Sequence, residues 1–192
     1  MRRVLIALAL SPLPAWADCP AAPEIGAAMD DLLAEVQAAA DERVARDVSG
    51  RMWAEWTRAP DARAQALLDE GMSRRAAFDL DGARTAFDAL IDYCPDYAEG
   101  WNQRAFASFI GGDHASALTD LDRALALRPR HVAALSGRGL TLIAMDRIAE
   151  GQDDIRAALE LNPWLSERQF LSLDPDGGPP DPDRVPEPEI DL

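Results

Sequence analysis

Three prolines recur at a constant interval in the second half of this chain. Pro95, Pro129 and Pro163 are each 34 residues apart. Other residues share this interval, both large apolar ones (Leu67, Trp101 and Leu135; Phe87, Leu121 and Ile155) and small ones (Gly71, Ala105 and Gly139; Ala83, Ala117 and Gly151). A period of this length predicts a repeated structural unit that cannot bury its apolar face alone, so that stacked units share one continuous core.

The repeated unit reads as a pair of helices. The sequence is rich in alanine and leucine, and it contains no alternating apolar and polar run long enough to indicate a strand. Small residues at fixed positions let two antiparallel helices approach closely, and each proline ends the second helix of its pair. Turns between paired helices are expected at 79–82, 111–113 and 146–147, where glycine and aspartate gather. The fold class is therefore all-α.

This spacing resembles the tetratricopeptide repeat, whose pattern is W-x₂-L-G-x₂-Y…A-x₃-F…P. Three units cover residues 64–97, 98–131 and 132–165, within the span 64–165. They depart from the pattern at its leucine and tyrosine, which are replaced by Glu70, Arg104 and Arg138 and by Arg74, Ser108 and Leu142. The resemblance implies a right-handed α-solenoid of antiparallel helix pairs.

Further helical segments flank the three units. Residues 18–63 are expected to add an N-terminal helical pair, a degenerate repeat that caps the stack, with its turn at Ser49-Gly50. Trp53 lies 34 residues before Phe87, so we read Trp53 and Trp56 as core of that pair, although an aromatic binding platform is the alternative. Residues 166–173 should end a capping helix, and 174–192 form an acidic, proline-rich tail that is expected to be disordered.

The first 17 residues have the features of a cleavable signal peptide. Arg2 and Arg3 precede the apolar run Val4–Leu10, and Ala15-Trp16-Ala17 suits cleavage after Ala17. We therefore expect a periplasmic protein that is not inserted in the membrane after cleavage. Loss of two arginines and no acids moves the net charge from −15 to −17. Such acidity argues against nucleic-acid partners and favours solubility or a basic partner.

Cys19 and Cys94 leave three possibilities open. In an up-and-down stack both lie at the same end, and the four residues after Cys19 span roughly 13 Å when extended, so a structural disulfide is feasible. Two free or intermolecular cysteines are the second possibility. A redox-active pair is the third, although the chain has no Cys-x-x-Cys.

No residue pattern indicates catalysis. His114 and His131 have no partners at metal-ligand spacing, so we read both as surface histidines. Gly111-Gly112 is explained as a turn rather than a phosphate loop, and Ser136 lacks the setting of a hydrolase nucleophile. We expect no enzyme activity, no metal and no cofactor.

The resemblance implies that the first helix of each pair lines a concave groove. Counting from residues 64, 98 and 132 assigns to it Leu68, Met72, Arg75, Asn102, Phe106, Phe109, Ile110, Ser136, Leu140 and Ile143. Family members that clamp an acidic carboxylate use lysine and arginine at such positions, whereas only Arg75 is comparable here. The groove is apolar and suits an apolar or amphipathic peptide or helix.

These features predict a non-catalytic scaffold or assembly factor that binds a protein or peptide partner. We expect a monomer, although the sequence leaves the oligomeric state open. The alternative is a structural subunit whose own terminal segment fills the groove while other faces dock into an envelope complex. A thiol-redox protein is a minor alternative.

Overall fold

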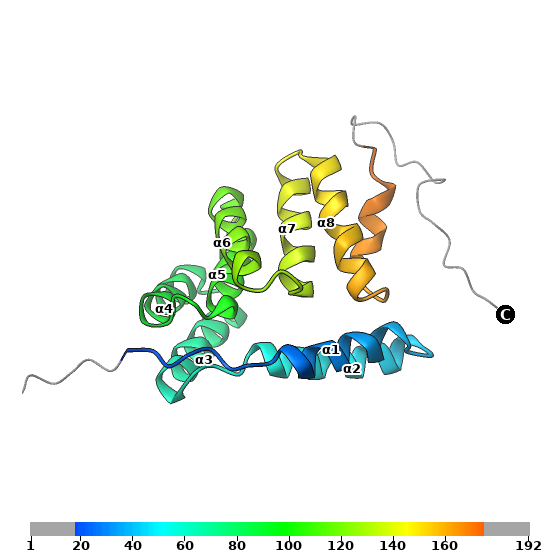
Figure 1. The fold of residues 1–192 in the computed structure, drawn as a ribbon. Helices are drawn as coiled ribbons and strands as arrows, with labels where there is room; N and C mark the ends of the chain where they lie inside the picture. The colour runs from blue at the N-terminus through cyan, green and yellow to red at the C-terminus, as the bar shows by residue number, and fades with distance from the viewer. Residues whose placement is uncertain (1–17, 175–192) are drawn as a thin grey trace, which may run out of the picture.

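The computed structural model describes residues 18–174 (Figure 1). The expected signal peptide and, from residue 175 onward, the expected acidic tail lie outside this range. Within it the chain is all-helical, as predicted. The elements are α1 (Gly26–Gln37), α2 (Glu42–Trp56), α3 (Ala62–Ala76), α4 (Leu80–Tyr93), α5 (Ala98–Ile110), α6 (His114–Leu127), α7 (Val132–Ala144), α8 (Ile148–Leu161) and the 3₁₀-helix η1 (Ser166–Ser172).

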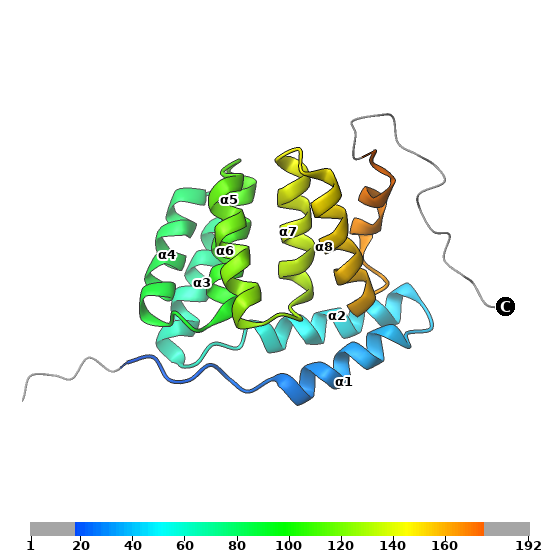
Figure 2. The ribbon, with the colours of Figure 1, turned by 45° about the horizontal axis from the view of Figure 1, so that its top comes forward.

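Helices α3 to α8 form three antiparallel pairs that stack side by side (Figure 2). The pairs coincide with the three predicted repeat units. The small residues act as predicted where α7 meets α8. A methyl group added at Gly139 would lie 2.7 Å from the Gly151 carbonyl oxygen, and one added at Gly151 would lie 2.5 Å from the Gly139 carbonyl oxygen. The two backbones are therefore too close for any side chain at either position.

The turn inside each pair uses a left-handed residue at the same repeat position. These residues are Phe78, Gly112 and Asp146, with φ of 61°, 79° and 62°. Asp79 and Asp113 follow, and their side chains accept the amide protons of Gly82 and Ser116 to cap the second helix. Glycine and aspartate were expected here, but Phe78 was not, because a bulky residue is disfavoured at positive φ.

Two arginines tie neighbouring pairs together. Arg104 donates from Nε to Asp120 of its own pair at 2.8 Å and from Nη1 to Asp88 of the preceding pair at 2.7 Å. Arg138, one repeat later, does the same with Asp154 and Asp122 at 2.7 and 2.9 Å. Hydrogen bonds to the aspartates raise the pKa of both guanidinium groups. The arginines that replace the family leucine therefore form an ion-pair ladder along the stack.

The N-terminal pair is not placed as a fourth stacked repeat. Helices α1 and α2 lie crosswise to the repeats, at the end of the α7–α8 pair (Figures 1 and 2). Their buried residues form a cluster with Val132 at the start of α7. This cluster packs against Leu161, the last residue of α8, and against Trp164 just beyond it. The expected N-terminal helical pair is therefore present, but it packs across the ends of later helices instead of continuing the stack next to α3.

The expected turn at Ser49-Gly50 was wrong. Both residues lie inside α2, where the Ser49 hydroxyl donates to the carbonyl of Ala45 at 2.8 Å and stays within the helix. The turn comes earlier, and α2 starts after Asp41. The Asp41 side chain accepts the Val44 amide proton at 2.9 Å, which is the capping bond that sets the start of the helix.

Several separate contacts hold the N-terminal region in place. A disulfide joins Cys19 to Cys94, with Cα atoms 5.2 Å apart, and the Arg128 guanidinium donates to the carbonyl of Pro23 at 2.9 Å. Gln37, at the end of α1, donates to the carbonyl of Glu160 in α8 at 2.8 Å. The sequence left three possibilities open for the two cysteines. The structure contains the first of them, a structural disulfide.

The C-terminal segment packs on α8. Gln152, a buried residue of that helix, donates to the carbonyls of Phe170 at 3.1 Å and Leu173 at 2.7 Å. Leu171 is buried beneath the same turn. The expected capping helix is therefore present as the 3₁₀-helix η1. Its backbone carbonyls accept hydrogen bonds from the amide side chain of Gln152.

Candidate functional site

A hollow of about 210 Å³ lies between α5 and α7. We call it the groove. Helix α2 contributes Trp53 to its wall, and η1 contributes Glu167. The other lining residues are Asn102, Gln103, Ala105, Phe106, Phe109, Leu121, Ala133, Ser136, Gly137, Leu140 and Thr141. Most of these side chains are apolar or small, so the groove offers hydrocarbon surface with a few polar groups at its edges.

Five of the ten residues predicted for the groove line it. They are Asn102, Phe106, Phe109, Ser136 and Leu140. Arg75 lies beside them, with its guanidinium carbon 4.5 Å from the centre of the Phe106 ring. The structure therefore brings together the predicted residues of α5 and α7, with one residue of α3 at the margin.

The other predicted groove residues do not line the hollow. Leu68 is fully buried in the core with Phe87, and Met72 packs against the same cluster. Ile143 faces α8, since its Cγ1 lies 2.7 Å from where a Gly151 methyl group would be. Ile110 is half-buried at the end of α5 outside the lining set. The prediction was wrong for Leu68 because the hollow lies between α5 and α7, whereas Leu68 of α3 is packed into the core of its own helix pair.

Eight lining residues were not predicted, and two of them, Trp53 and Glu167, come from outside the repeat helices. Trp53 was read as core, but its side chain is 38% exposed and faces the groove, whereas Trp56 is buried at 7%. The periodicity could not separate these two tryptophans because the placement of α2 does not follow the repeat. Glu167 carries no sequence signal, since it reaches the groove only through the packing of η1 on α8.

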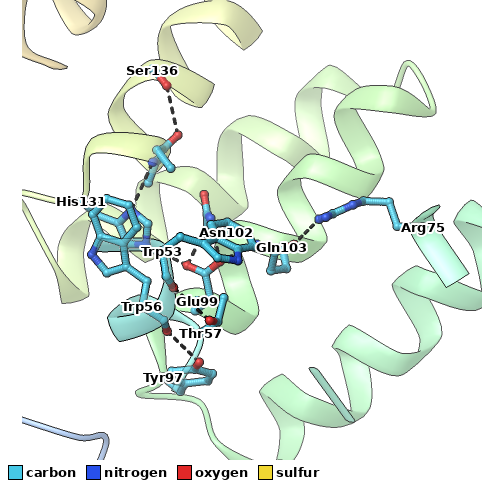
Figure 3. A network of polar contacts seen from close by, with 12 residues as sticks. Trp53, Trp56, Thr57, Arg75, Tyr97, Glu99, Asn102, Gln103, His131 and Ser136 are labelled. Carbon is cyan, nitrogen blue, oxygen red and sulfur yellow. Dashed lines mark hydrogen bonds and ion pairs between the residues drawn. The ribbon is translucent and has the colours of Figure 1, made fainter. Parts of the chain in front are cut away.

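A buried polar network lies beneath the groove (Figure 3). Its centre is Glu99, which is 1% exposed. The Glu99 carboxylate accepts hydrogen bonds from His131 Nε2 at 2.8 Å and Asn102 Nδ2 at 3.2 Å, and a further one from Gln103 Nε2. A buried carboxylate is tolerated only when donors satisfy it in this way. The network therefore fixes Asn102 and Gln103, both of which line the groove.

His131 links this network to the N-terminal pair. Its Nδ1 accepts the Ala134 amide proton at 3.3 Å and caps α7, so the ring proton lies on Nε2 and is donated to Glu99. The Trp56 ring stacks on the imidazole with centroids 4.3 Å apart. His131 is 1% exposed, so the expectation of a surface histidine was wrong. The neutral His131 therefore connects α2 to α7, since its ring stacks on Trp56 and caps α7.

Arg75 completes the network from α3. Its guanidinium donates to Gln103 Oε1, and Gln103 in turn donates to Glu99. Burial lowers the pKa of Arg75, while the Glu99 charge acts in the opposite direction. An arginine remains a cation at neutral pH even after such a shift. Arg75 therefore supplies the positive charge that balances Glu99 through one intervening amide.

Tyr97 anchors the same end of α2, because Trp56 is the last residue of that helix. Its hydroxyl donates to the carbonyl of Trp56 at 2.8 Å, and burial raises the pKa of Tyr97, which keeps the phenol neutral. This bond holds the Trp56 backbone, and the stacking on His131 holds its ring, so that Trp56 is fixed against the repeats. The neighbouring Trp53 is thereby positioned on the groove wall.

Neither a metal-binding cluster nor a membrane-spanning helix occurs among residues 18–174. In the described part of the chain, no three His, Cys, Asp or Glu side chains are close enough to hold a metal ion. No helix among residues 18–174 is both long and apolar enough to cross a bilayer. The Ser136 hydroxyl donates to the carbonyl of Ala133 at 3.4 Å. His131 is hydrogen-bonded to Glu99 and not to Ser136.

Known proteins are similar to this chain in sequence. A TPR repeat-containing protein of Rhizobium etli is 28% identical over 156 residues, which cover 73% of this chain and 74% of the relative. Tetratricopeptide repeat protein 36 of Bos taurus is 34% identical over 122 residues, which cover 62% of this chain and 65% of the relative. No protein-family model matches the chain.

Among solved structures, the first TPR of Spaghetti (RPAP3) bound to the HSP90 peptide SRMEEVD is similar to this chain. The TM-score is 0.55 at 26% sequence identity, and the match covers 56% of this chain and 90% of that structure. The similarity therefore extends over a length that corresponds to the repeat region rather than to the whole chain.

Proposed function

The chain is a tetratricopeptide repeat protein, and on that premise we propose that it is a non-catalytic protein-interaction module. Its groove would hold an apolar or amphipathic segment of a protein partner, as in a scaffold or assembly factor. The observation that carries this proposal is an exposed apolar wall: Phe106 is 48% exposed and Trp53 is 38% exposed, and both line the groove. Covering such aromatic surface is favourable by about 25 cal/mol per Å².

The similarity to a structure bound to a peptide supports this use of the groove. The chemistry differs, however, from the clamping of an acidic carboxylate. Arg75 is the basic residue beside the groove, and it is already engaged by Gln103 and the Phe106 ring. The lining set itself contains no lysine or arginine. We therefore propose an apolar anchor rather than a carboxylate clamp.

The position of the C-terminal segment supports an open groove. A self-filled groove requires the large apolar residues of 164–173 to pack on Phe106 and Phe109. Trp164 instead packs against the α1–α2 cluster, and Leu165 packs against that cluster and the core of the later repeats. Only Glu167 from this segment lines the groove. These contacts favour a binding module over a subunit whose groove is closed.

We also propose that the protein works in the periplasm after cleavage behind Ala17. Support comes from the basic start and apolar run of residues 1–17 and from the disulfide, because disulfides persist in oxidising compartments. Cys94 is 2% exposed and already paired, which leaves the thiol-redox alternative without an accessible thiol.

The test is a titration with defined amphipathic peptides. The probes are fluorescent 15-residue helix formers with leucine at positions i, i+3, i+4 and i+7, and binding to the mature chain is followed by anisotropy. Phe106→Glu should weaken binding at least about tenfold, because a charge replaces a central aromatic contact. Phe78→Glu is the matched control, since Phe78 is 76% exposed but outside the groove.

Circular dichroism must show that both variants remain folded. The proposal is supported if Phe106→Glu loses the probe and Phe78→Glu retains it. It fails if no probe in the series binds the parent protein, or if a folded Phe106→Glu variant binds as the parent does.

A further inference from the structure

We propose that the partner segment carries a lysine or arginine beside its apolar residues, and that this cation pairs with Glu167 on the groove wall. This inference rests on the proposed function and specifies the chemistry of the partner. The charges at the groove are Glu99 beneath it, Arg75 beside it and Glu167 on its wall.

The first two charges cancel each other. Arg75 donates to Gln103, and Gln103 donates to Glu99, so the cation and the anion are linked through one amide side chain. His131 adds no charge, because its Nδ1 accepts the Ala134 amide proton and its single ring proton is donated to Glu99. A ligand in the groove therefore meets no net charge from this buried set.

Glu167 is different because nothing in residues 18–174 forms an ion pair with it. Its Oε2 accepts a hydrogen bond from the Ser166 hydroxyl at 3.3 Å. The adjacent Arg168 points its Nε at the carbonyl of Leu165 instead, at 3.3 Å. By contrast, the acidic residues along the repeat stack, such as Asp88 and Asp120, are held by arginines. Glu167 thus presents an uncompensated, half-buried carboxylate beside apolar side chains.

An apolar surround strengthens the attraction of this carboxylate for a cation. Charges interact more strongly where water is displaced, and a segment seated on Phe106 and Trp53 would displace water from around Glu167. An acidic segment would meet repulsion at the same place. The overall charge of −15 acts in the same direction at longer range, but it does so without regard to the groove.

The experiment compares three probe peptides with the same leucine spacing and different flanks, namely lysine, glutamine or glutamate. Anisotropy titrations use the full mature chain with its disulfide intact. The Lys-flanked probe should bind about tenfold more tightly than the Gln-flanked probe, as expected for one charge-assisted hydrogen bond. The Glu-flanked probe should bind most weakly.

Two charge-matched variants separate a local pair from the overall field. Glu167→Gln should abolish the preference for the lysine flank. Glu160→Gln makes the same change in net charge on the exposed surface of α8 and should preserve the preference. Glu167→Lys should reverse it, so that the Glu-flanked probe binds more tightly than the Lys-flanked probe.

Each outcome either supports or refutes the pairing of the partner's cation with Glu167. If Glu167→Gln and Glu160→Gln reduce the preference equally, the overall charge causes it and the pairing with Glu167 is refuted. If all three probes bind the parent equally, the inference fails while the proposed function stands. If none of them binds, the proposed function and the inference fail together.

Discussion

In the repeat stack the same contact recurs from one helix pair to the next, whereas the α1–α2 pair is attached by contacts without a counterpart in other repeats. Arg104 and Arg138 form the same ion pairs one repeat apart. The N-terminal pair depends instead on Trp56 stacked on His131 and on the Cys19–Cys94 bridge. The periodic sequence thus determines the contacts that recur between repeats, whereas single residues determine how the α1–α2 pair is attached.

The groove lies where these two regions meet. Helices α5 and α7 of the stack supply its floor, and α2 adds Trp53 to its wall. A regular array of repeats would leave this surface open along its whole length. The crosswise pair closes one part of it and turns a general concave surface into a bounded site. Three predictions test how independent the two regions are.

Removal of the disulfide should have the largest effect. The bridge closes a separation of 75 residues, and loss of such a closure costs about 4 kcal/mol of unfolding free energy. Cys19→Ala/Cys94→Ala should therefore lower the stability measured by urea denaturation and loosen the N-terminal segment first. Hydrogen exchange should show this as faster exchange in α1 than in α7. Equal stability of the variant and the parent would show that the bridge does not constrain this region.

Loss of one arginine from the ion-pair ladder should have the second-largest effect on stability. Arg104→Leu restores the family residue but leaves Asp120, whose side chain is 5% exposed, without its cation, and we expect a loss of about 3 kcal/mol. Arg46→Leu in α2 is the control, because its ion pair with Glu42 is fully on the surface, and should change stability by about 0.5 kcal/mol or less. A stabilising Arg104→Leu change would mean that the ladder sets register rather than stability.

One substitution should have opposite signs in the two regions. Gly151→Ala would place a methyl group 2.5 Å from the Gly139 carbonyl oxygen, and overpacking of this kind costs about 2 kcal/mol. Gly50→Ala in α2 meets no atom within 4 Å and should stabilise the protein by about 0.7 kcal/mol. Thermal melts of both variants measure this difference directly. Destabilisation by both changes would contradict the open surface assigned to α2.

The sequence allowed prediction of those features that repeat. The period located all three helix pairs, and it also identified the close approach at Gly139 and Gly151. Counting positions succeeded for Phe106 and Leu140 but not for Leu68. The position of Leu68 is largely buried in every repeat, since Asn102 and Ser136 are each only 6% exposed. Counting positions along a helix shows which face a residue lies on, but it does not show how deeply that residue is buried.

The remaining features depend on pairs that no period encodes. His131 was read as a surface residue because its partners, Trp56 and Glu99, are distant in the sequence. Trp53 was read as core because its distance from Phe87 fits the repeat, although α2 does not join the stack. Both errors come from the crosswise docking of α2, which depends on aromatic stacking and a buried hydrogen bond.

The most direct test of the account maps the bound probe on the protein. Isotope-labelled mature chain is titrated with the Lys-flanked peptide, and amide and methyl chemical shifts are followed by NMR. We predict that shifts concentrate around Phe106 and Leu140 and at the Trp53 indole, while resonances near Asp122 on the arginine ladder stay unchanged. Shifts confined to α4, α6 and α8, with Phe106 and Leu140 unaffected, would contradict a binding site in the groove.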